Sequence, residues 1–235
     1  MPIIERPSPN FDARPDGGPI DILVLHYTGM RTAEEALVRL CDPEAKVSSH
    51  YTIDEAGIIY RHVEESKRAR HAGVSYWAGE RDVNNRSIGI EIVNPGHEFG
   101  YVPFPEVQIA AVIELSRDIL ARHVIPPQRV VGHSDVAPAR KMDPGELFPW
   151  ERLAQNGVGL YPSEPMLDSM TRASETSFAS MLASYGYGVA PDLDIPLALV
   201  VMAFQRHFRP KKLDGAIDAE SQARLRTLLE MMKSK

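Results

Sequence analysis

Short apolar runs bounded by turn residues alternate with amphipathic stretches along the first two thirds of the chain. The run IDILVL ends in a histidine, and the run IGIEIV places isoleucine at every second position. Apolar runs of this length, flanked by glycine, proline or asparagine, are typical of buried strands. The pattern predicts strands at 20–25, 48–54, 58–61, 88–93 and 130–132, with a tight turn at 56–57 between the second and third.

Two helices are predicted among these strands. Thr32 and Glu35 form a capping-box signature at the start of the first helix, which ends at Pro43. Apolar residues recur at helical spacing over 105–123 and predict the second helix. Residues 1–19 contain several prolines and no periodicity, so we expect an extended arm on the surface.

The last third of the chain has a different pattern. A stretch rich in glycine and proline is followed by three amphipathic segments, at 175–185, 196–207 and 218–233. The sequence therefore predicts an α/β protein with a small helical domain after it. The predicted boundaries are 1–160 for the α/β domain, 161–172 for a linker and 173–235 for the three-helix domain.

Composition limits the classes of function. The chain has 235 residues and a formal net charge of −6, which argues against a general nucleic-acid binder. The single cysteine, Cys41, allows neither an intrachain disulfide nor a cysteine-based zinc site. We find no signal peptide and no segment that is long and apolar enough for a membrane span. We therefore expect a cytoplasmic protein, or a periplasmic one if the native chain begins earlier; no sequence feature defines an oligomeric state.

Two histidines lie where predicted strands end. His26 follows the run at 20–25, and His133 follows the run at 130–132. Asp143 comes ten residues later, directly before a proline. Because a catalytic zinc takes three nitrogen or oxygen ligands and keeps one open position, His26, His133 and Asp143 are a candidate ligand set.

Two further residues are candidates for catalysis. In the strand at 88–93 the isoleucines take one face, so Glu91 projects from the opposite face. A carboxylate at such a position could accept a proton from a water molecule and pass it to a leaving nitrogen. Lys141 lies two residues before Asp143 and could stabilise negative charge on an attacked carbonyl oxygen.

Simpler interpretations stay open at this point. His26 and His133 lie far apart in the sequence, so their pattern alone favours hydrogen-bonded histidines over a metal site. Tyr27 and Trp77 are expected to pack in part, although exposed aromatic rings suit sugar faces. The basic segment 206–212 is typical of a solvated loop but could meet an anionic glycan. The other histidines are expected to be at the surface or hydrogen-bonded; they are His50, His62, His71, His97, His123 and His207.

Five motifs in order resemble the zinc-dependent N-acetylmuramoyl-L-alanine amidases of the type 2 family. They are LVLHYTG at 23–29, SSHYTID at 48–54, RHAGVSYWAG at 70–79, NNRSIGIEIVNPG at 84–96 and GHSDVAPARKMDPG at 132–145. The resemblance implies the mixed central sheet, flanked by helices, of phage T7 lysozyme and the peptidoglycan recognition proteins. It implies zinc ligands at His26, His133 and Asp143, with Glu91 and Lys141 catalytic. The implied substrate contacts are Tyr27, His71, Ala72, Trp77 and Asn85.

The resemblance also implies a function. The expected reaction is hydrolysis of the amide between N-acetylmuramic acid, or its anhydro form, and L-alanine in peptidoglycan or muropeptides. The last three helices resemble a peptidoglycan-binding domain, which suggests large substrates, whereas the absent signal peptide suggests recycled fragments. A non-catalytic peptidoglycan receptor of the same fold is the alternative, and a zinc hydrolase of some other amide is a third.

Overall fold

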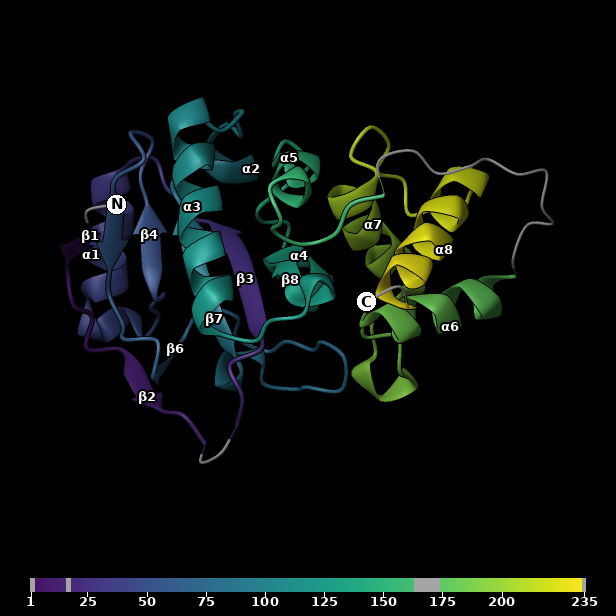
Figure 1. Cartoon of the computed structure of the whole chain (residues 1–235), viewed down its shortest axis with the longest axis horizontal. Coiled ribbons are helices and arrows are strands. Elements are labelled where there is room, and N and C mark those ends of the chain that lie inside the picture. The colour runs from purple at the N-terminus through teal and green to yellow at the C-terminus, as the bar shows by residue number, and fades with distance from the viewer. Residues whose placement is uncertain (1–2, 16–17, 163–173, 234–235) are drawn as a thin grey trace.

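A mixed six-stranded sheet lies at the centre of the computed structural model, which describes residues 3–15, 18–162 and 174–233 (Figure 1). The strand order is β1-β5-β4-β7-β3-β8. Strands β4, β7, β3 and β8 run parallel, and β5 and β1 run opposite to them. Strands β2 and β6 form a separate antiparallel pair. The strands are β1 (Ile3–Glu5), β2 (Phe11–Ala13), β3 (Ile22–Tyr27), β4 (Tyr51–Ile53), β5 (Ile59–Arg61), β6 (Lys67–Ala69), β7 (Ser87–Ile92) and β8 (Val130–Gly132).

Helices cover the sheet and continue beyond its β8 edge. The longest, α3, crosses one face of the sheet in Figure 1. The short helix α4 begins directly where β8 ends. The α-helices are α1 (Ala33–Cys41), α2 (Gly96–Phe99), α3 (Glu106–Arg122), α4 (His133–Val136), α5 (Trp150–Gln155), α6 (Glu175–Tyr185), α7 (Leu197–Phe208) and α8 (Ala219–Lys233), with 3-10 turns at Pro43–Ala45, Val83–Asn85, Pro127–Arg129 and Pro191–Leu193.

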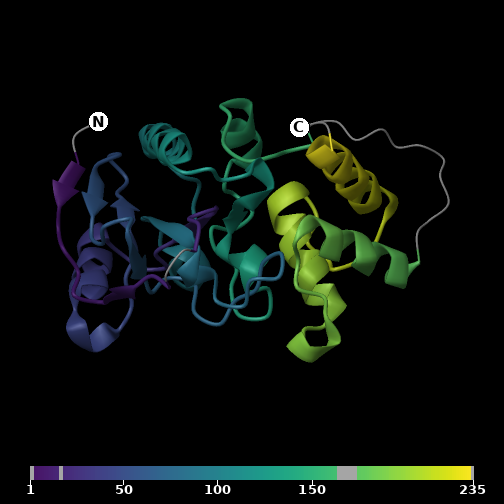
Figure 2. The ribbon, with the colours of Figure 1, turned by 60° about the horizontal axis from the view of Figure 1, so that its bottom comes forward.

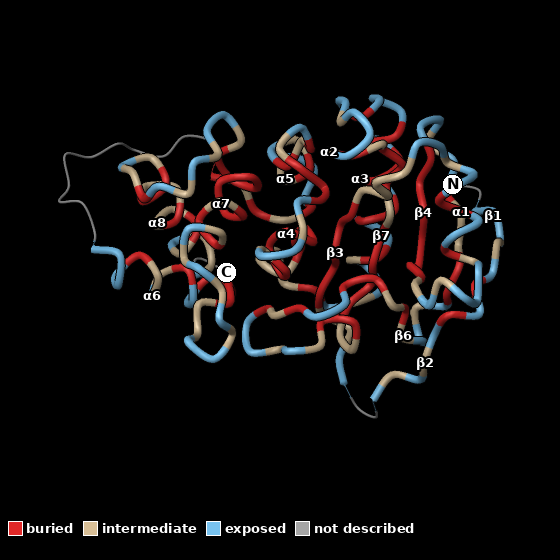
Figure 3. The backbone as a smooth tube through the Cα atoms, turned by 180° about the vertical axis from the view of Figure 1, so that it is seen from behind, coloured by how far each residue is buried: buried red, intermediate tan, exposed pale blue. Residues whose placement is uncertain are grey.

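The two faces of the sheet belong to two apolar clusters. Alternation along β3 and β7 sends Leu23, Leu25 and the three isoleucines of β7 toward α3. Figure 3 shows these central strands as the most continuously buried part of the chain. The isoleucine face predicted for residues 88–93 is confirmed, and Glu91 points to the other face beside His26.

The second face is buried partly by the last three helices. Ile22, Val24 and Val131 belong to one apolar cluster with Phe178 and Leu182 of α6 and with buried residues of α7 and α8. Figures 1 and 2 both show these helices gathered beside the β8 edge, next to α4. The α/β part and the last three helices, called the tail from here on, therefore share a core. Residues 163–173, which include most of the predicted linker, lie outside the described part.

Most predicted elements are confirmed, with bounds that differ by a few residues. The turn at Gly57 adopts a positive φ of 79° and joins β4 to β5 as a hairpin. The described residues of the N-terminal arm are mostly exposed, but Ser8 and Asn10 are buried, and the arm contributes β1 and β2, which the prediction omitted. The segment between His133 and Asp143 is helical and then turns. Among the described helices, none combines the length and apolar character needed to cross a lipid bilayer.

Candidate metal centre and its cleft

Three side-chain atoms converge where β3 and β8 end. Nδ1 of His26 lies 2.9 Å from Nδ1 of His133 and 3.1 Å from Oδ2 of Asp143. Nδ1 of His133 lies 3.0 Å from the same carboxylate oxygen. All three residues are almost fully buried. The predicted set is therefore brought together from one strand end, the first turn of α4 and the turn after it.

The spacing of these atoms fits a small tetrahedral cation. Ligands at the usual zinc distances stand about 3.3 Å apart, close to the edges of this triangle. Nε2 of His133 must carry a proton, because its partner at 3.0 Å is the carbonyl oxygen of Ala72. In the neutral ring, Nδ1 then presents a lone pair to the triangle. Two lone pairs and a carboxylate facing one another are a donor set that a divalent cation satisfies.

A chain of hydrogen bonds gives His26 the same tautomer as His133, with its proton on Nε2 and a lone pair on Nδ1. Nε2 of His26 lies 3.0 Å from Nδ1 of His71, whose Nε2 lies 3.1 Å from the hydroxyl of Ser87. Burial and the neighbouring His26 ring hold the pKa of His71 well below its usual value. A neutral His71 that accepts from His26 at Nδ1 leaves Nδ1 of His26 free for a metal.

Backbone contacts fix the positions of His133 and Asp143 relative to each other. The amide of Ser134 donates to the carbonyl oxygen of Asp143 at 2.9 Å. A side chain at Gly132 would lie 2.8 Å from Cδ of Pro144, so the residue before His133 and the residue after Asp143 are in close contact. This packing holds the ends of the two ligand segments together.

Burial and charge set the protonation of the ligands. Burial lowers the pKa of His26 to about 4, and the nearby His133 acts in the same direction. Burial by itself raises the pKa of Asp143, but the charge and hydrogen bonds of His133 and His26 outweigh it, so this pKa lies well below its usual value. A neutral imidazole and an ionised carboxylate are the forms that bind metal.

Glu91 lies beside the triangle in a different environment. Its Oε1 is 4.0 Å from Nδ1 of His26, and 15% of its side chain is exposed. Its Oε2 is buried and has no hydrogen-bond partner within the part of the chain that the structure describes. Burial and the charge of Asp143 raise the pKa of Glu91 well above its usual value, against the opposing charge of Lys141. A carboxyl group with a raised pKa beside a candidate metal site is suited to accept and donate a proton.

The triangle opens into a cleft of about 420 Å³. His133, Asp143, Glu91 and Lys141 are among the residues that line it. Tyr27 and His71 also line the cleft, so the structure places both of these predicted contacts where a ligand could reach them. Four basic residues in the lining, Arg39, Arg70, Arg140 and Lys141, suit an anionic ligand.

Three of the predicted substrate contacts are not among the residues that line this cleft. Trp77 is fully buried and packs against Tyr187, with ring centroids 4.9 Å apart, so the expected contact is corrected to a core role. Ala72 is fully buried, and its carbonyl oxygen orients His133 instead. Asn85 is not in the cleft, because its side-chain oxygen accepts from Arg68.

The neighbouring Asn84, rather than Asn85, supports the site, and the sequence motif did not distinguish the two. Its Oδ1 accepts from the amides of His71 and Ala72 at 3.1 and 2.9 Å. It thereby holds the loop that orients both histidine ligands. Two adjacent asparagines give no sequence signal that would have separated them.

The remaining histidines are hydrogen-bonded, as the simpler interpretation predicted. Their partners include the amide of Gly89 for His50, Thr52 for His62, Glu146 for His97, Glu65 for His123 and Asp135 for His207.

The chain matches the family model described as N-acetylmuramoyl-L-alanine amidase over residues 16–146. It is 41% identical to the N-acetylmuramoyl-L-alanine amidase AmiD of Escherichia coli over 90% of this chain and 83% of that protein. The solved complex of E. coli AmiD with anhydro-N-acetylmuramic acid-L-Ala-D-gamma-Glu-L-Lys superposes with a TM-score of 0.81 at 40% identity, covering 93% of this chain and 91% of the other. AMPDH3 of Pseudomonas aeruginosa, in complex with anhydromuramic pentapeptide, has a TM-score of 0.80 at 33% identity, covering 92% and 94%. The chain belongs to the N-acetylmuramoyl-L-alanine amidase family.

Proposed function

We propose that this protein is a zinc-dependent amidase that hydrolyses the bond between the lactyl carbonyl of anhydro-N-acetylmuramic acid and the nitrogen of L-alanine. One observation carries the proposal: three metal-ligating atoms lie within 3.1 Å of one another, with the carboxyl group of Glu91 beside them. The arrangement lies in a cleft that is open to a peptide. Membership of the amidase family supports the same reaction.

The zinc would be held by Nδ1 of His26, Nδ1 of His133 and Oδ2 of Asp143. When bound, zinc supplies a Lewis acid that polarises a carbonyl group and lowers the pKa of a water molecule. His71 and the carbonyl of Ala72 keep both imidazoles in the tautomer that this requires.

Glu91 would move the proton. As a carboxylate it accepts a proton from the attacking water, and as an acid it delivers that proton to the alanine nitrogen when the amide breaks. Its raised pKa makes it a stronger base than an ordinary glutamate, which helps it to take and hold the proton before it passes that proton on. The free Oε2 is available for this exchange because no described residue occupies it.

Lys141 would stabilise the oxygen of the attacked carbonyl. Its ammonium group lies close enough to lower the pKa of Glu91, and it lines the same cleft. A fixed positive charge at this place favours the negative charge that develops on the carbonyl oxygen during attack.

The anhydro form of the sugar is proposed from the two solved complexes, whose ligands are anhydromuramic peptides. A peptidoglycan receptor without activity would need neither a poised carboxyl group nor a complete ligand triangle. No observation favours a different amide over the muramoyl one.

The test is digestion of soluble anhydromuropeptides and of intact sacculi, with the products weighed by mass spectrometry. The expected result is a free peptide stem that begins with L-alanine, lost after chelation and restored by zinc. Glu91→Gln should keep zinc and lose about 10²–10⁴-fold in turnover, while the exposed Glu55→Gln should match the native protein. Cleavage that persists without metal, or a Glu91→Gln variant with normal turnover, would contradict the proposal.

A further inference from the structure

Two consecutive residues of α7, Arg206 and His207, are buried although they belong to a basic run that predicted a solvated loop. Their exposed fractions are 8% and 4%. The end of the same run behaves as predicted, because the side chain of Lys212 is 54% exposed. Arg206 and His207 instead meet the segments of the α/β part that form the metal centre and the rim of the cleft.

His207 binds a buried carboxylate directly behind a metal ligand. Its Nδ1 donates to Oδ2 of Asp135 at 2.7 Å, and the hydroxyl of Tyr187 donates to Oδ1 at 2.6 Å. The same Oδ2 accepts from the amide of Gly132 at 2.7 Å. Asp135 therefore joins two residues of the tail to the backbone immediately before His133.

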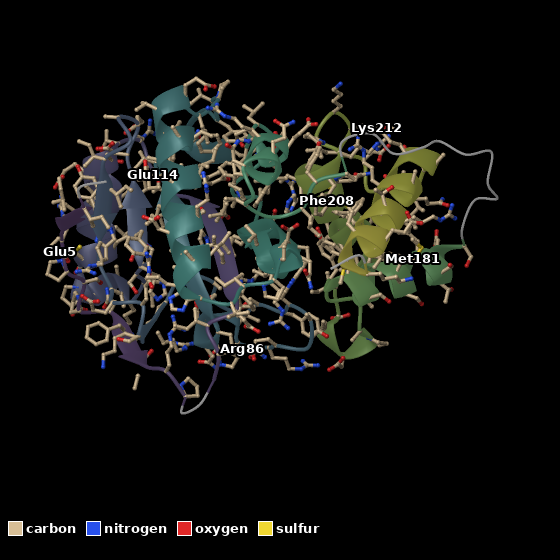
Figure 4. All side chains as sticks on the ribbon, in the orientation of Figure 1. Glu5, Arg86, Glu114, Met181, Phe208 and Lys212 are labelled. Atoms are coloured by element: carbon tan, nitrogen blue, oxygen red, sulfur yellow. The ribbon has the colours of Figure 1, made fainter. Side chains whose placement is uncertain are left out.

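Aromatic stacking fixes the imidazole of His207. The ring lies between Trp150 of α5, at a centroid distance of 3.7 Å, and Phe208, at 3.8 Å. Figure 4 shows Phe208 on the side of the tail that faces the α/β part. Because the ring is held on both faces, its N–H points in one direction. The hydrogen bond to Asp135 therefore fixes the position of that carboxylate.

Arg206 is linked through other side chains to the lining of the cleft. Its Nε lies 3.7 Å from Oε2 of Glu146, which accepts from Nε2 of His97 at 3.1 Å. With that proton on Nε2, Nδ1 of His97 accepts from the hydroxyl of Tyr27 at 2.9 Å. Tyr27 follows the ligand His26 and lines the cleft. The chain of contacts thus ends at a residue that a substrate would meet.

We propose that helix α7 is a positioning element of the active site. His207 holds the His133 ligand in place through Asp135, and Arg206 holds Tyr27 at the rim through Glu146 and His97. Arg206 and His207 are positioning residues, because neither belongs to the metal triangle or lines the cleft. The inference rests on the proposed function only in that the triangle holds zinc.

Packing alone does not account for this arrangement. The apolar cluster shared by the sheet and the tail already joins the two parts. Burying a carboxylate costs desolvation free energy, and an apolar pair would fill the same space without that cost. Three directional donors on Asp135 instead define where the N-terminus of α4 lies, and His133 is its first residue.

The first test measures zinc affinity of the full-length protein by competition with a chelator. His207→Phe keeps the stacked ring and removes the donor, whereas His207→Asn keeps a donor near the position of Nδ1. We expect His207→Phe to bind zinc about tenfold more weakly and His207→Asn to stay close to the native protein. Gln205→Ala is the matched control, because Gln205 is buried in α7 and its hydrogen bonds stay within the tail.

The result is decided by the comparison between variants. A His207→Phe variant with native zinc affinity would overturn the inference, and so would a Gln205→Ala variant that loses as much affinity as His207→Phe. A native protein that holds no zinc would instead refute the proposed function itself, and with it this inference. The melting temperature of each variant shows how much of any change is general destabilisation.

The second test concerns the other side of the cleft. Arg206→Met should raise the KM for an anhydromuropeptide about threefold or more while zinc affinity stays native, because Tyr27 is not a ligand. Arg206→Lys, which keeps the positive charge, should recover most of the native KM. An unchanged KM in Arg206→Met would remove this half of the proposal.

Discussion

Gly89 on β7 leaves the space that the imidazole of His71 occupies. A side-chain carbon at position 89 would lie 2.5 Å from Cγ of His71, which is closer than van der Waals contact allows. Because His71 in turn lies 3.0 Å from Nε2 of His26, this glycine indirectly sets the orientation of a metal ligand. A glycine within a buried strand often marks a place where another group approaches closely.

Gly89→Ala should therefore weaken the metal site. The added methyl group displaces His71, and the loss of its hydrogen bond to His26 should reduce zinc affinity about 10–100-fold. Overpacking should also cost about 1–3 kcal/mol of unfolding free energy. Chelator competition and urea unfolding measure the two effects. Gly18→Ala, at a site with space around it, serves as the control, and native zinc affinity in Gly89→Ala would contradict the assignment.

Lys141→Met should move the pH profile in a defined direction. Burial and Asp143 raise the pKa of Glu91, and the charge of Lys141 lowers it. Removing that charge raises the pKa of Glu91 further. Since the carboxylate form is the base, the acidic limb of kcat/KM should shift to higher pH, in addition to a fall in kcat. Lys141→Arg should keep the native limb; a limb that moves to lower pH in Lys141→Met would refute the coupling.

Glu65 should contribute stability that depends on pH. Burial raises its pKa, but hydrogen bonds from Arg122, His123 and Tyr51 outweigh this and lower the pKa from 4.5 to about 2. The folded protein thus holds the carboxylate form, so the contribution is complete above pH 4.5 and is lost as the pH falls toward 2. The shift corresponds to about 3 kcal/mol at neutral pH.

Urea unfolding of Glu65→Gln tests this at two pH values. The variant should be less stable than the native protein at pH 7, and the difference should shrink by about half or more near pH 3. Glu55→Gln, at an exposed turn, should show no such difference. A Glu65→Gln penalty that is equal at both pH values would show that the carboxylate charge is not its source.

The positions of the candidate ligands and of Glu91 could be predicted because the strands that carry them have local signals. Alternation along β3 and β7 places Glu91 on the side of His26 and opposite to Ile90, whatever the rest of the fold does. The strand ends at His26 and His133 follow from apolar runs of a few residues. These features depend on the periodicity of a single segment, which a reader of the sequence sees directly.

The parts that were missed depend on contacts between distant segments. Asp135 looks like an ordinary polar residue of a loop until His207 and Tyr187 of the tail reach it. Trp77 lies among residues that resemble a substrate cleft, yet it is fully buried and packs against Tyr185 and Tyr187 of the tail. The tail was predicted as a separate domain, and its packing on the sheet could not be read from the amphipathic pattern of its helices.

The shared apolar cluster predicts that the chain unfolds as one cooperative unit. Leu182 of α6 is fully buried in the cluster that also contains Ile22 and Val24 of β3. Leu182→Ala should cost about 2–5 kcal/mol, because it leaves a cavity in a core that both parts use. The fluorescence of two tryptophans reports on the contact between the tail and the rest of the protein, because Trp77 packs against Tyr187 and Trp150 stacks on His207.

In urea, the change in tryptophan fluorescence and the release of zinc should therefore occur at the same denaturant concentration, in the native protein and in Leu182→Ala alike. Val124→Ala, at an exposed position, should leave the midpoint unchanged. If the tail instead folds as an independent domain, fluorescence should change in Leu182→Ala while zinc stays bound. That separation would show that the tail can leave the sheet without disturbing the ligands, which would argue against α7 as a support of the site.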